Sequence, residues 1–219
     1  VKLLLDHSDS KKIELNARDN RGFTAFMWAC NGHKDVVKLL IDHSSCTNID
    51  LNARSTLVLT VFLIALEKGH KGVVKLLLEH SERIELNARS NTGRTAFMWA
   101  CYNGHKDVVQ LLLEHSSEDI DINAIDRYGS TAIKFACIKG HKDVVQLLLE
   151  RFDTEESGLN TKGREGWTAL MEACFNGHKD VVQLILKHSG RSIELNAKHN
   201  YGYTALIFAC DYGYKDIVQ

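Results

Sequence analysis

Hydrophobic residues gather in two kinds of short segment that alternate along the chain. The first kind, such as "TAFMWAC" at residues 95–101, is apolar almost all round and is followed closely by Gly104. Glycine adopts at least cost the left-handed conformation that ends a helix. The pattern predicts a short, deeply buried helix.

The second kind of segment is amphipathic. In "KDVVQLLLEHS" at residues 106–116, Val108, Leu111 and Leu112 follow helical spacing and polar residues occupy the other side. Asp107 lies in the first turn, where it complements the helix dipole by roughly 0.3–1 kcal/mol. This segment predicts a second helix with one buried face.

Polar, glycine-containing stretches join each pair of helices to the next. The stretch "ELNARSNTGRT" at residues 85–95 has the Asn, Ser and Gly residues of an extended segment folded at a tight turn. The predicted unit is therefore helix, turn, helix and a protruding hairpin-like loop.

This unit is written about six times, at intervals of 35 to 37 residues. "GHK" recurs, with one "GYK", at Gly32, Gly69, Gly104, Gly140, Gly177 and Gly213. One helix pair is too small to bury its own apolar faces, so neighbouring pairs must stack. We predict an all-α repeat solenoid of stacked helix-turn-helix units with short β-hairpin-like loops.

The predicted organisation is one repeat domain over residues 1–219. Its first residues, "VKLLLDHS", duplicate "VVKLLIDHS" at residues 36–44, so we expect a fragment of a longer array. The expected units are a partial repeat 1–15, then 16–51, a degenerate repeat 52–86, 87–122, 123–159, 160–195 and a truncated repeat 196–219.

Composition excludes several classes of function. Hydrophobic residues make up 44% of the chain and charged residues 25%, which is typical of a globular protein. With 27 basic against 28 acidic residues, no global positive field favours nucleic acid. The sequence shows neither a signal peptide nor an apolar run long enough for membrane insertion. We expect an intracellular protein that is located in the cytoplasm, with the nucleus as the alternative location.

The sequence at residues 94–124, "RTAFMWACYNGHKDVVQLLLEHS" and then "IDINA", resembles the ankyrin repeat, and the resemblance recurs in register along the whole chain. It departs from the family in two ways. The usual Thr-Pro-Leu-His is Thr-Ala-Phe-Met at residues 95–98, and the units are two to four residues longer than usual. The surplus follows the second helix, where a recurring isoleucine is expected to tuck back onto the core: Ile13, Ile49, Ile84, Ile120 and Ile193.

The cysteines and histidines follow the repeat rather than forming a reactive site. One equivalent position holds Cys30, Cys101, Cys137, Cys174 and Cys210, and only Cys46 lies elsewhere. Equivalent Cα atoms in stacked repeats lie about 9–10 Å apart, beyond the reach of a disulfide. We predict buried packing cysteines and structural histidines. A Cys/His enzyme is the competing hypothesis, and it requires Cys101 to be more reactive than Cys137.

No catalytic or phosphate-binding motif is present. We therefore predict no catalytic residue, no metal site, no cofactor and no small-molecule substrate.

Binding information must lie where the copies differ, on the turns and at the ends of the first helices. The variable positions there are basic and aromatic, the side chains that dominate binding hot spots. The candidate partner-binding residues are Arg18, Phe23, Arg89, Arg94, Tyr102, Arg127, Tyr128, Arg164, Trp167, Phe175, Tyr201 and Tyr203. Two alternatives remain open: these side chains fill gaps between neighbouring turns, or they stack on the bases of a nucleic acid, against which the neutral charge argues.

The second copy is anomalous because its turn reads "TLVL", with Leu57, Val58 and Leu59 in place of polar residues and glycine. These residues form either an apolar docking patch or a drifted turn held by its neighbours.

These observations predict a non-catalytic protein-protein interaction scaffold that binds partner proteins through the concave face of hairpins and first helices. The alternative is a regulatory or targeting ankyrin segment of a longer enzyme, channel or pathogen effector.

Overall fold

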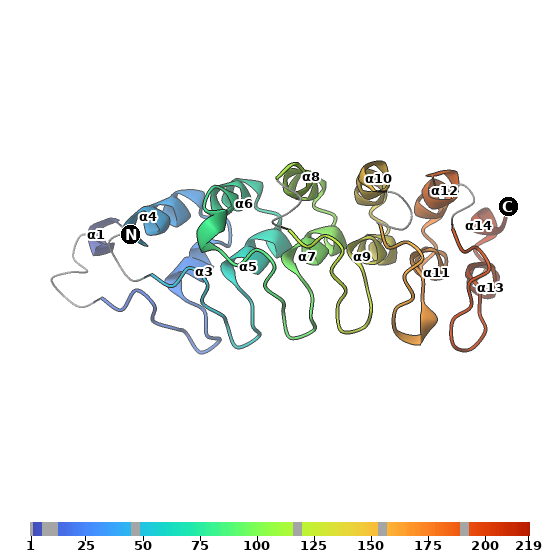
Figure 1. Cartoon of the computed structure of the whole chain (residues 1–219), viewed down its shortest axis with the longest axis horizontal. Coiled ribbons are helices and arrows are strands. Elements are labelled where there is room, and N and C mark those ends of the chain that lie inside the picture. Colours follow the sequence, from blue (N-terminus) through green and yellow to red (C-terminus); the bar gives the residue numbers. More distant parts are fainter. Residues whose placement is uncertain (1, 6–12, 45–48, 116–119, 153–156, 189–192) are drawn as a thin grey trace.

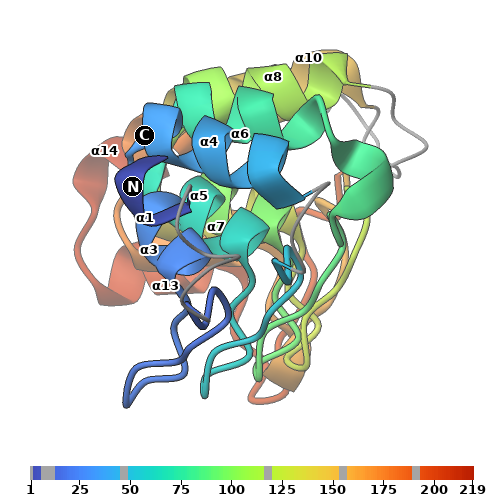
Figure 2. The ribbon, with the colours of Figure 1, turned by 90° about the vertical axis from the view of Figure 1, so that its left-hand side faces the viewer.

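The computed structural model describes residues 2–5, 13–44, 49–115, 120–152, 157–188 and 193–219. Paired helices stack side by side in two layers, and the loops between pairs project beyond the inner layer (Figure 1). The end-on view separates the two helical layers from the loops (Figure 2). The described residues contain no β-strand. The predicted all-helical solenoid is confirmed.

Each unit contributes one first helix to the inner layer and one second helix to the outer layer. The first helices are α3 Ala25–Ala29, α5 Val61–Lys68, α7 Ala96–Tyr102, α9 Ala132–Lys139, α11 Ala169–Phe175 and α13 Ala205–Asp211. The second helices are α1 Lys2–Leu5, α4 Lys34–Ser44, α6 Lys71–Leu78, α8 Lys106–Glu114, α10 Lys142–Arg151, α12 Lys179–His188 and α14 Lys215–Val218. Two short 3₁₀ turns, η1 Ser81–Arg83 and η2 Arg164–Gly166, interrupt the loops.

The first helices begin after a threonine, and those between the two end repeats are mostly buried. The Thr95 hydroxyl accepts a hydrogen bond from the Met98 N–H at 3.4 Å, which satisfies one of the free donors at the start of α7. After the helix, Gly104 adopts a φ of 72°. The left-handed glycine and the buried helix were both predicted from the sequence.

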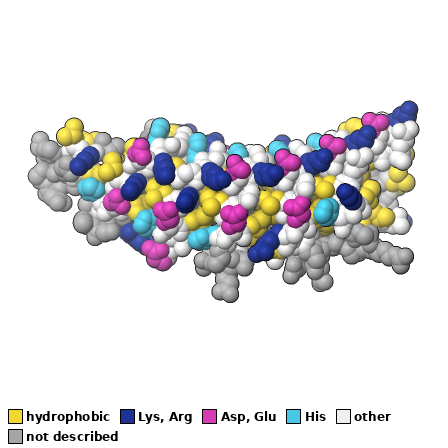
Figure 3. Space-filling model, turned by 90° about the horizontal axis from the view of Figure 1, so that it is seen from above, with side chains coloured by type: hydrophobic (Ala, Val, Ile, Leu, Met, Phe, Trp, Pro, Cys, Tyr) yellow, Lys and Arg dark blue, Asp and Glu magenta, His cyan; other side chains and the backbone are white. Residues whose placement is uncertain are grey.

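The second helices bury one face and expose the other. Val108 and Leu112 are buried, whereas Lys106, Gln110 and Glu114 are exposed. Basic and acidic side chains therefore alternate along the outer layer (Figure 3). Some of them pair between repeats, as Lys179 Nζ does with Asp216 Oδ2 at 3.7 Å.

The Gly-His junction links each repeat to the one before it. His141 Nε2 donates to the Tyr102 carbonyl at 2.9 Å, and a Cβ added to Gly104 would lie 2.5 Å from His141 Nδ1. Although His141 stands at the N-cap of α10, its ring forms no capping hydrogen bond. The junction position thus requires glycine for two reasons. Its backbone adopts the left-handed conformation, and a side chain there would overlap the histidine ring of the next repeat.

The loops also bind one another at their base. The Asn52 side-chain oxygen accepts from the Glu85 N–H, and Asn87 accepts from Asp121, both at 2.8 Å. The isoleucines expected to tuck back are buried at Ile49, Ile84, Ile120 and Ile193, and Ile13 is half-buried. Cys46 and His7 lie outside the described residues.

Candidate protein-binding face

Two rows of side chains run along the inner layer, and we call them together the loop-helix face. The loop row is the residue before each helix-starting threonine: Phe23, Leu59, Arg94, Ser130, Trp167 and Tyr203. The helix row is the fourth residue of each first helix: Trp28, Ile64, Trp99, Phe135, Glu172 and Phe208.

The two rows interlock within and between repeats. Within a repeat, the ring centroids of Phe23 and Trp28 lie 5.2 Å apart. Between repeats, Trp167 stacks on Phe208 at 4.5 Å. The longer loop-row side chains, Phe23, Arg94, Trp167 and Tyr203, thus contact the helix row of their own repeat, of the next repeat, or of both.

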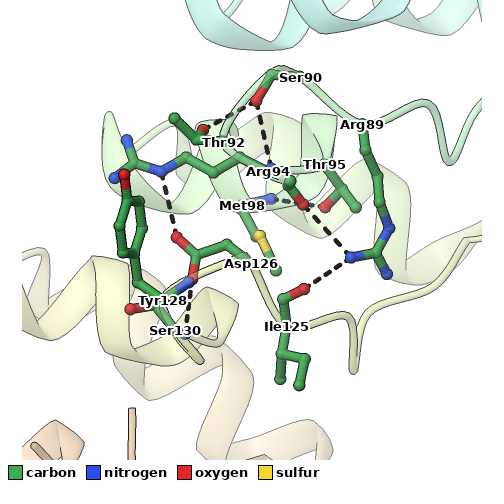
Figure 4. A network of polar contacts seen from close by, with 11 residues as sticks. Arg89, Ser90, Thr92, Arg94, Thr95, Met98, Ile125, Asp126, Tyr128 and Ser130 are labelled. Carbon is green, nitrogen blue, oxygen red and sulfur yellow. Dashed lines mark hydrogen bonds and ion pairs between the residues drawn. The ribbon is translucent and has the colours of Figure 1, made fainter. Parts of the chain in front are cut away.

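Arg94 contacts the helix row of its own repeat and of the next repeat. Its pairing with Asp126 joins the repeats of α7 and α9 (Figure 4). Its guanidinium lies 5.2 Å from the Trp99 ring centroid and 4.5 Å from that of Phe135. Arg94 Nε lies 3.5 Å from Asp126 Oδ2, and the Asp126 side chain is fully buried. Asp126 Oδ1 in turn accepts from the Tyr128 and Ser130 N–H groups. The guanidinium therefore contacts two aromatic rings and one buried carboxylate of its own chain.

The basic residues that follow each "NA" bind the next loop. Arg89 Nη1 donates to the Ile125 carbonyl at 2.7 Å and Arg89 Nη2 pairs with Asp121 at 3.5 Å. Arg18 Nη1 donates to the Arg54 carbonyl at 2.6 Å. Both arginines remain exposed, although each already donates a hydrogen bond to the next loop and Arg89 is also paired with a carboxylate there.

The aromatic residues are densest at the last two described repeats. We call this set the C-terminal aromatic group: Trp167, Phe175, His199, Tyr201, Tyr203, Phe208 and Tyr212. Trp167 and Phe175 pack edge-to-face at 5.2 Å. Tyr201 is 76% exposed and Tyr212 50%. The group thus has a packed base and an accessible rim.

The structure brings all the predicted partner-binding residues to the loops or the inner layer, with different accessibility. The exposed ones are Arg18, Arg89, Arg127, Tyr128, Arg164, Tyr201 and Tyr203. The half-buried ones are Phe23, Arg94, Tyr102, Trp167 and Phe175. Packing between turns therefore accounts for part of the second set, and the binding role of both sets stays a prediction.

The apolar turn of the degenerate repeat is only partly exposed. Leu57 is 61% exposed, whereas Leu59 packs against the core. Val58 takes a φ of 59°, the left-handed conformation that glycine holds in the other turns. Most neighbouring turn tips are joined by a backbone hydrogen bond, such as Arg127 N–H to the Thr92 carbonyl.

The equivalent bond from Asn91 to Leu57 is not formed, although both residues lie in the described part of the chain. A cavity of about 480 Å³, lined in part by Val58, Asn91 and the side chains of Arg54 and Arg89, opens beside this break.

Two charged residues of the inner layer escaped the sequence reasoning. Lys134 is buried where the other copies have Met, Leu or Ile, and its ammonium donates to the Trp167 carbonyl at 2.9 Å. Glu172 stands in the helix row where the other copies are apolar. Burial lowers the pKa of Lys134 and raises that of Glu172. The signal was present, because each is the only charged residue in its column of aligned copies.

The environment of the cysteines disfavours thiolate chemistry. Cys30, Cys101 and Cys137 are buried, and burial raises the pKa of each thiol far above its ordinary value. The same effect raises the pKa of Cys174 to about 11. His105 Nε2 donates to the Glu67 carbonyl at 2.9 Å. Within the described residues, no group of His, Cys, Asp and Glu is arranged to hold a metal ion.

The stacked helix pairs, junction glycines and projecting loops define a repeat protein of the ankyrin class. The family described as Ankyrin repeats (3 copies) matches residues 1–55, 62–157 and 153–219, so the chain belongs to this family. Ankyrin repeats are generally protein-protein interaction modules and are typically non-catalytic. A search of curated proteins finds no match. Among the described residues, no helix has the length and apolar character needed to cross a bilayer.

Proposed function

We propose that this protein is a non-catalytic scaffold that binds partner proteins through the loop-helix face and the loop tips beside it. One observation carries the proposal. Every exposed large aromatic residue of the described chain lies on a loop or at a first helix, and none lies on the second helices: Trp28, Tyr128, Tyr201, Tyr203 and Tyr212.

The size of this surface suits a protein partner. A fully accessible aromatic side chain contributes about 150–250 Å² of contact, and the five named here are 37–76% exposed, so they supply a substantial part of the roughly 800 Å² per partner of a standard interface. The packed residues beneath them, such as Trp167 and Phe175, hold the rim in place and reduce the entropy lost on binding. The outer layer presents mixed charges instead, which favour solvation.

The test compares two matched triple variants. The face variant changes Tyr128, Tyr201 and Tyr212 to Ser, and the control changes the exposed outer-layer residues Gln110, Gln146 and Gln183 to Ser. Peptides and domains are selected from a display library on the wild-type protein, and their affinities for both variants are measured by interferometry. We expect the face variant to weaken binding by about tenfold or more, because each lost aromatic anchor is worth about 1–2 kcal/mol.

The control should bind within about twofold of wild type, since surface changes away from the contact have small effects. Equal losses in both variants, or no loss in the face variant, would overturn the proposal. Thermal unfolding of both variants shows that the fold is intact.

A further inference from the structure

Two aromatic groups on the loop-helix face already hold a cation of their own chain. Arg21 lies 4.6 Å from the Trp28 ring centroid, and Asp19 accepts a hydrogen bond from the Trp28 indole. In the next group, Arg94 lies over Phe135 and pairs with Asp126. In both cases an arginine covers aromatic rings and a carboxylate lies beside them, the arrangement of a stabilising cation-π contact.

The C-terminal aromatic group has the rings and the carboxylate but no such cation. No Arg or Lys of the described residues lies over any of its rings. Glu172 stands in the helix row between Phe135 and Phe208, and Phe175 follows it by one helical turn. Asp211 adds a second, exposed carboxylate one turn after Phe208.

The Glu172 carboxylate is half-buried and makes no hydrogen bond or ion pair with the part of the chain that the structure describes. The charge of Lys134 attracts this carboxylate, but the Lys134 ammonium donates its hydrogen bond to the Trp167 carbonyl. The carboxylate is partly desolvated, so it attracts a cation more strongly than a fully exposed carboxylate does, and its hydrogen-bond acceptors remain available to a cationic group from outside the chain.

The loop row explains why the position is open. Arg94 contacts the helix row of its own repeat at Trp99 and of the next at Phe135. In the following repeat the equivalent residue is Ser130, and its neighbours in the helix row are Phe135 and Glu172. Serine is too short to make these contacts, so the chain supplies no arginine there.

We propose that the C-terminal aromatic group, with Glu172, binds an arginine side chain of the partner protein, an inference that rests on the proposed function. Arginine fits better than lysine because its planar guanidinium stacks on rings while it donates to a carboxylate. The partner's arginine would take the role that Arg94 plays one repeat earlier.

The probe is the capped pentapeptide Gly-Gly-Arg-Gly-Gly, with a matched peptide in which neutral citrulline replaces arginine. Binding is followed by NMR through the indole N–H signals of the three tryptophans, at mildly alkaline pH, because burial raises the pKa of Glu172 and a higher pH favours its ionised form. We expect the arginine peptide to shift the Trp167 signal saturably, with an affinity about 5- to 10-fold above that of the citrulline peptide. Trp28 and Trp99, which already hold arginines, are internal references.

Two variants test the assignment to Glu172. E172Q keeps the shape and should bring the two peptides within about twofold of each other, whereas E79Q removes an exposed outer-layer charge and should leave the preference intact. Equal binding of both peptides by the wild type, or a preference that survives in E172Q, would overturn the inference. Equal shifts at all three tryptophans would show unspecific attraction and overturn it as well.

A third variant fills the site from within. In S130R, the new side chain stands where Arg94 stands in the preceding repeat, so we expect it to occupy the position beside Glu172 and to exclude the arginine peptide. S130R removes no packing, which keeps the test valid if E172Q is destabilised. Unchanged peptide binding by a folded S130R would contradict the proposed position.

The two proposals fail in different ways. If library clones depend on Tyr128, Tyr201 and Tyr212 but the pentapeptides bind equally, only the arginine site is wrong. If the arginine preference depends on Glu172 but no clone depends on the tyrosines, only the broader interface is wrong.

Discussion

The ammonium group of Lys134 occupies the space that a side chain at Gly163 would take. In the loops of the other repeats this position holds Asp, Ser or His. Where that residue is buried, the residue equivalent to Lys134 in the preceding repeat is Met or Leu, as in the pairs Met27 and Ser55 or Met98 and Asp126. Figure 4 shows the ordinary arrangement of Met98 and Asp126. The larger, charged side chain of Lys134 in one repeat is therefore compensated by the absence of a side chain at Gly163 in the next repeat.

This relationship predicts strong coupling between the two positions. We expect G163S to lower the free energy of unfolding by about 1–3 kcal/mol, because it displaces a buried ammonium from the Trp167 carbonyl. In K134M/G163S the part of the loss caused by the displaced ammonium should disappear, since this pair restores the combination of Met27 and Ser55. The close approach of the new Cβ to the Tyr128 and Gly129 carbonyl oxygens, at 3.0 and 3.1 Å, remains in both variants. Urea unfolding of the four proteins of the cycle measures the coupling, and additive effects would show that the two residues are independent.

Glu172 predicts a specific pH dependence of stability. Burial raises its pKa above the ordinary value of 4.5, and Lys134 opposes part of that rise. The folded state thus binds this proton more tightly than the unfolded state, so the resulting stabilisation is full below pH 4.5 and is lost as the pH rises through the folded-state pKa. Relative to E172Q, which does not titrate, the wild type should lose stability across that window.

Urea unfolding of both proteins over a pH series measures the difference. Parallel stability curves for the wild type and E172Q would show that Glu172 titrates alike in the folded and unfolded chain. E79Q, with an exposed carboxylate removed, is the matched control and should follow the wild type.

The sequence predicted best the structural features that recur at equivalent positions of every repeat. Burial of Cys101, the left-handed Gly104 and the buried Ile84 all followed from register, because the same neighbours recur in every unit. Register says less about which side chains meet across repeats. Arg94 pairs with the carboxylate of Asp126, 32 residues away in the sequence. Whether these two side chains meet depends on the rotation between adjacent repeats.

The same limit applies to the candidate binding residues. The sequence predicted Arg89 and Tyr201 equally as partner-binding residues. In the structure, however, Arg89 donates a hydrogen bond to the next loop, whereas Tyr201 is 76% exposed. Lys134 and Glu172 are each the only charged residue in an otherwise apolar column of aligned copies, so a comparison of the copies column by column marks both. Departures from the repeat thus indicated special positions more reliably than residue type did.

Arg94 is expected to contribute mainly to stability. R94M keeps an unbranched apolar stem but removes the guanidinium from the Trp99 and Phe135 rings and from buried Asp126. We expect a loss of about 1–3 kcal/mol in the free energy of unfolding. The control R127M, at an exposed arginine of the neighbouring loop, should stay within about 0.5 kcal/mol of wild type. Unchanged stability of R94M, with loss of partner binding, would assign Arg94 to the interface instead.

The thiols predict a clear order of alkylation. Cys101 and Cys137 are buried to the same degree and their pKa values are raised by the same cause, so both should resist iodoacetamide in the folded protein. Cys210 is exposed and should react first among the described cysteines. Mass spectrometry of tryptic peptides over time gives the order. Faster labelling of Cys101 than of Cys137 would instead support the Cys/His enzyme hypothesis.

Val58 predicts a stabilising substitution in the degenerate turn. A β-branched residue at a φ of 59° is strained, by about 1–3 kcal/mol, whereas the equivalent Gly22 and Gly93 adopt this conformation freely. V58G removes the strain but increases the entropy of the unfolded chain by about 0.4–1 kcal/mol, so we expect a net gain of roughly 0.5–2 kcal/mol. The matched control G93A should be destabilising, because φ is 81° there and an added Cβ would meet the Arg127 backbone nitrogen at 3.0 Å. Urea unfolding measures both changes. A V58G protein less stable than wild type would mean that the packing of the valine side chain outweighs its backbone strain, and that the apolar turn is maintained by the fold.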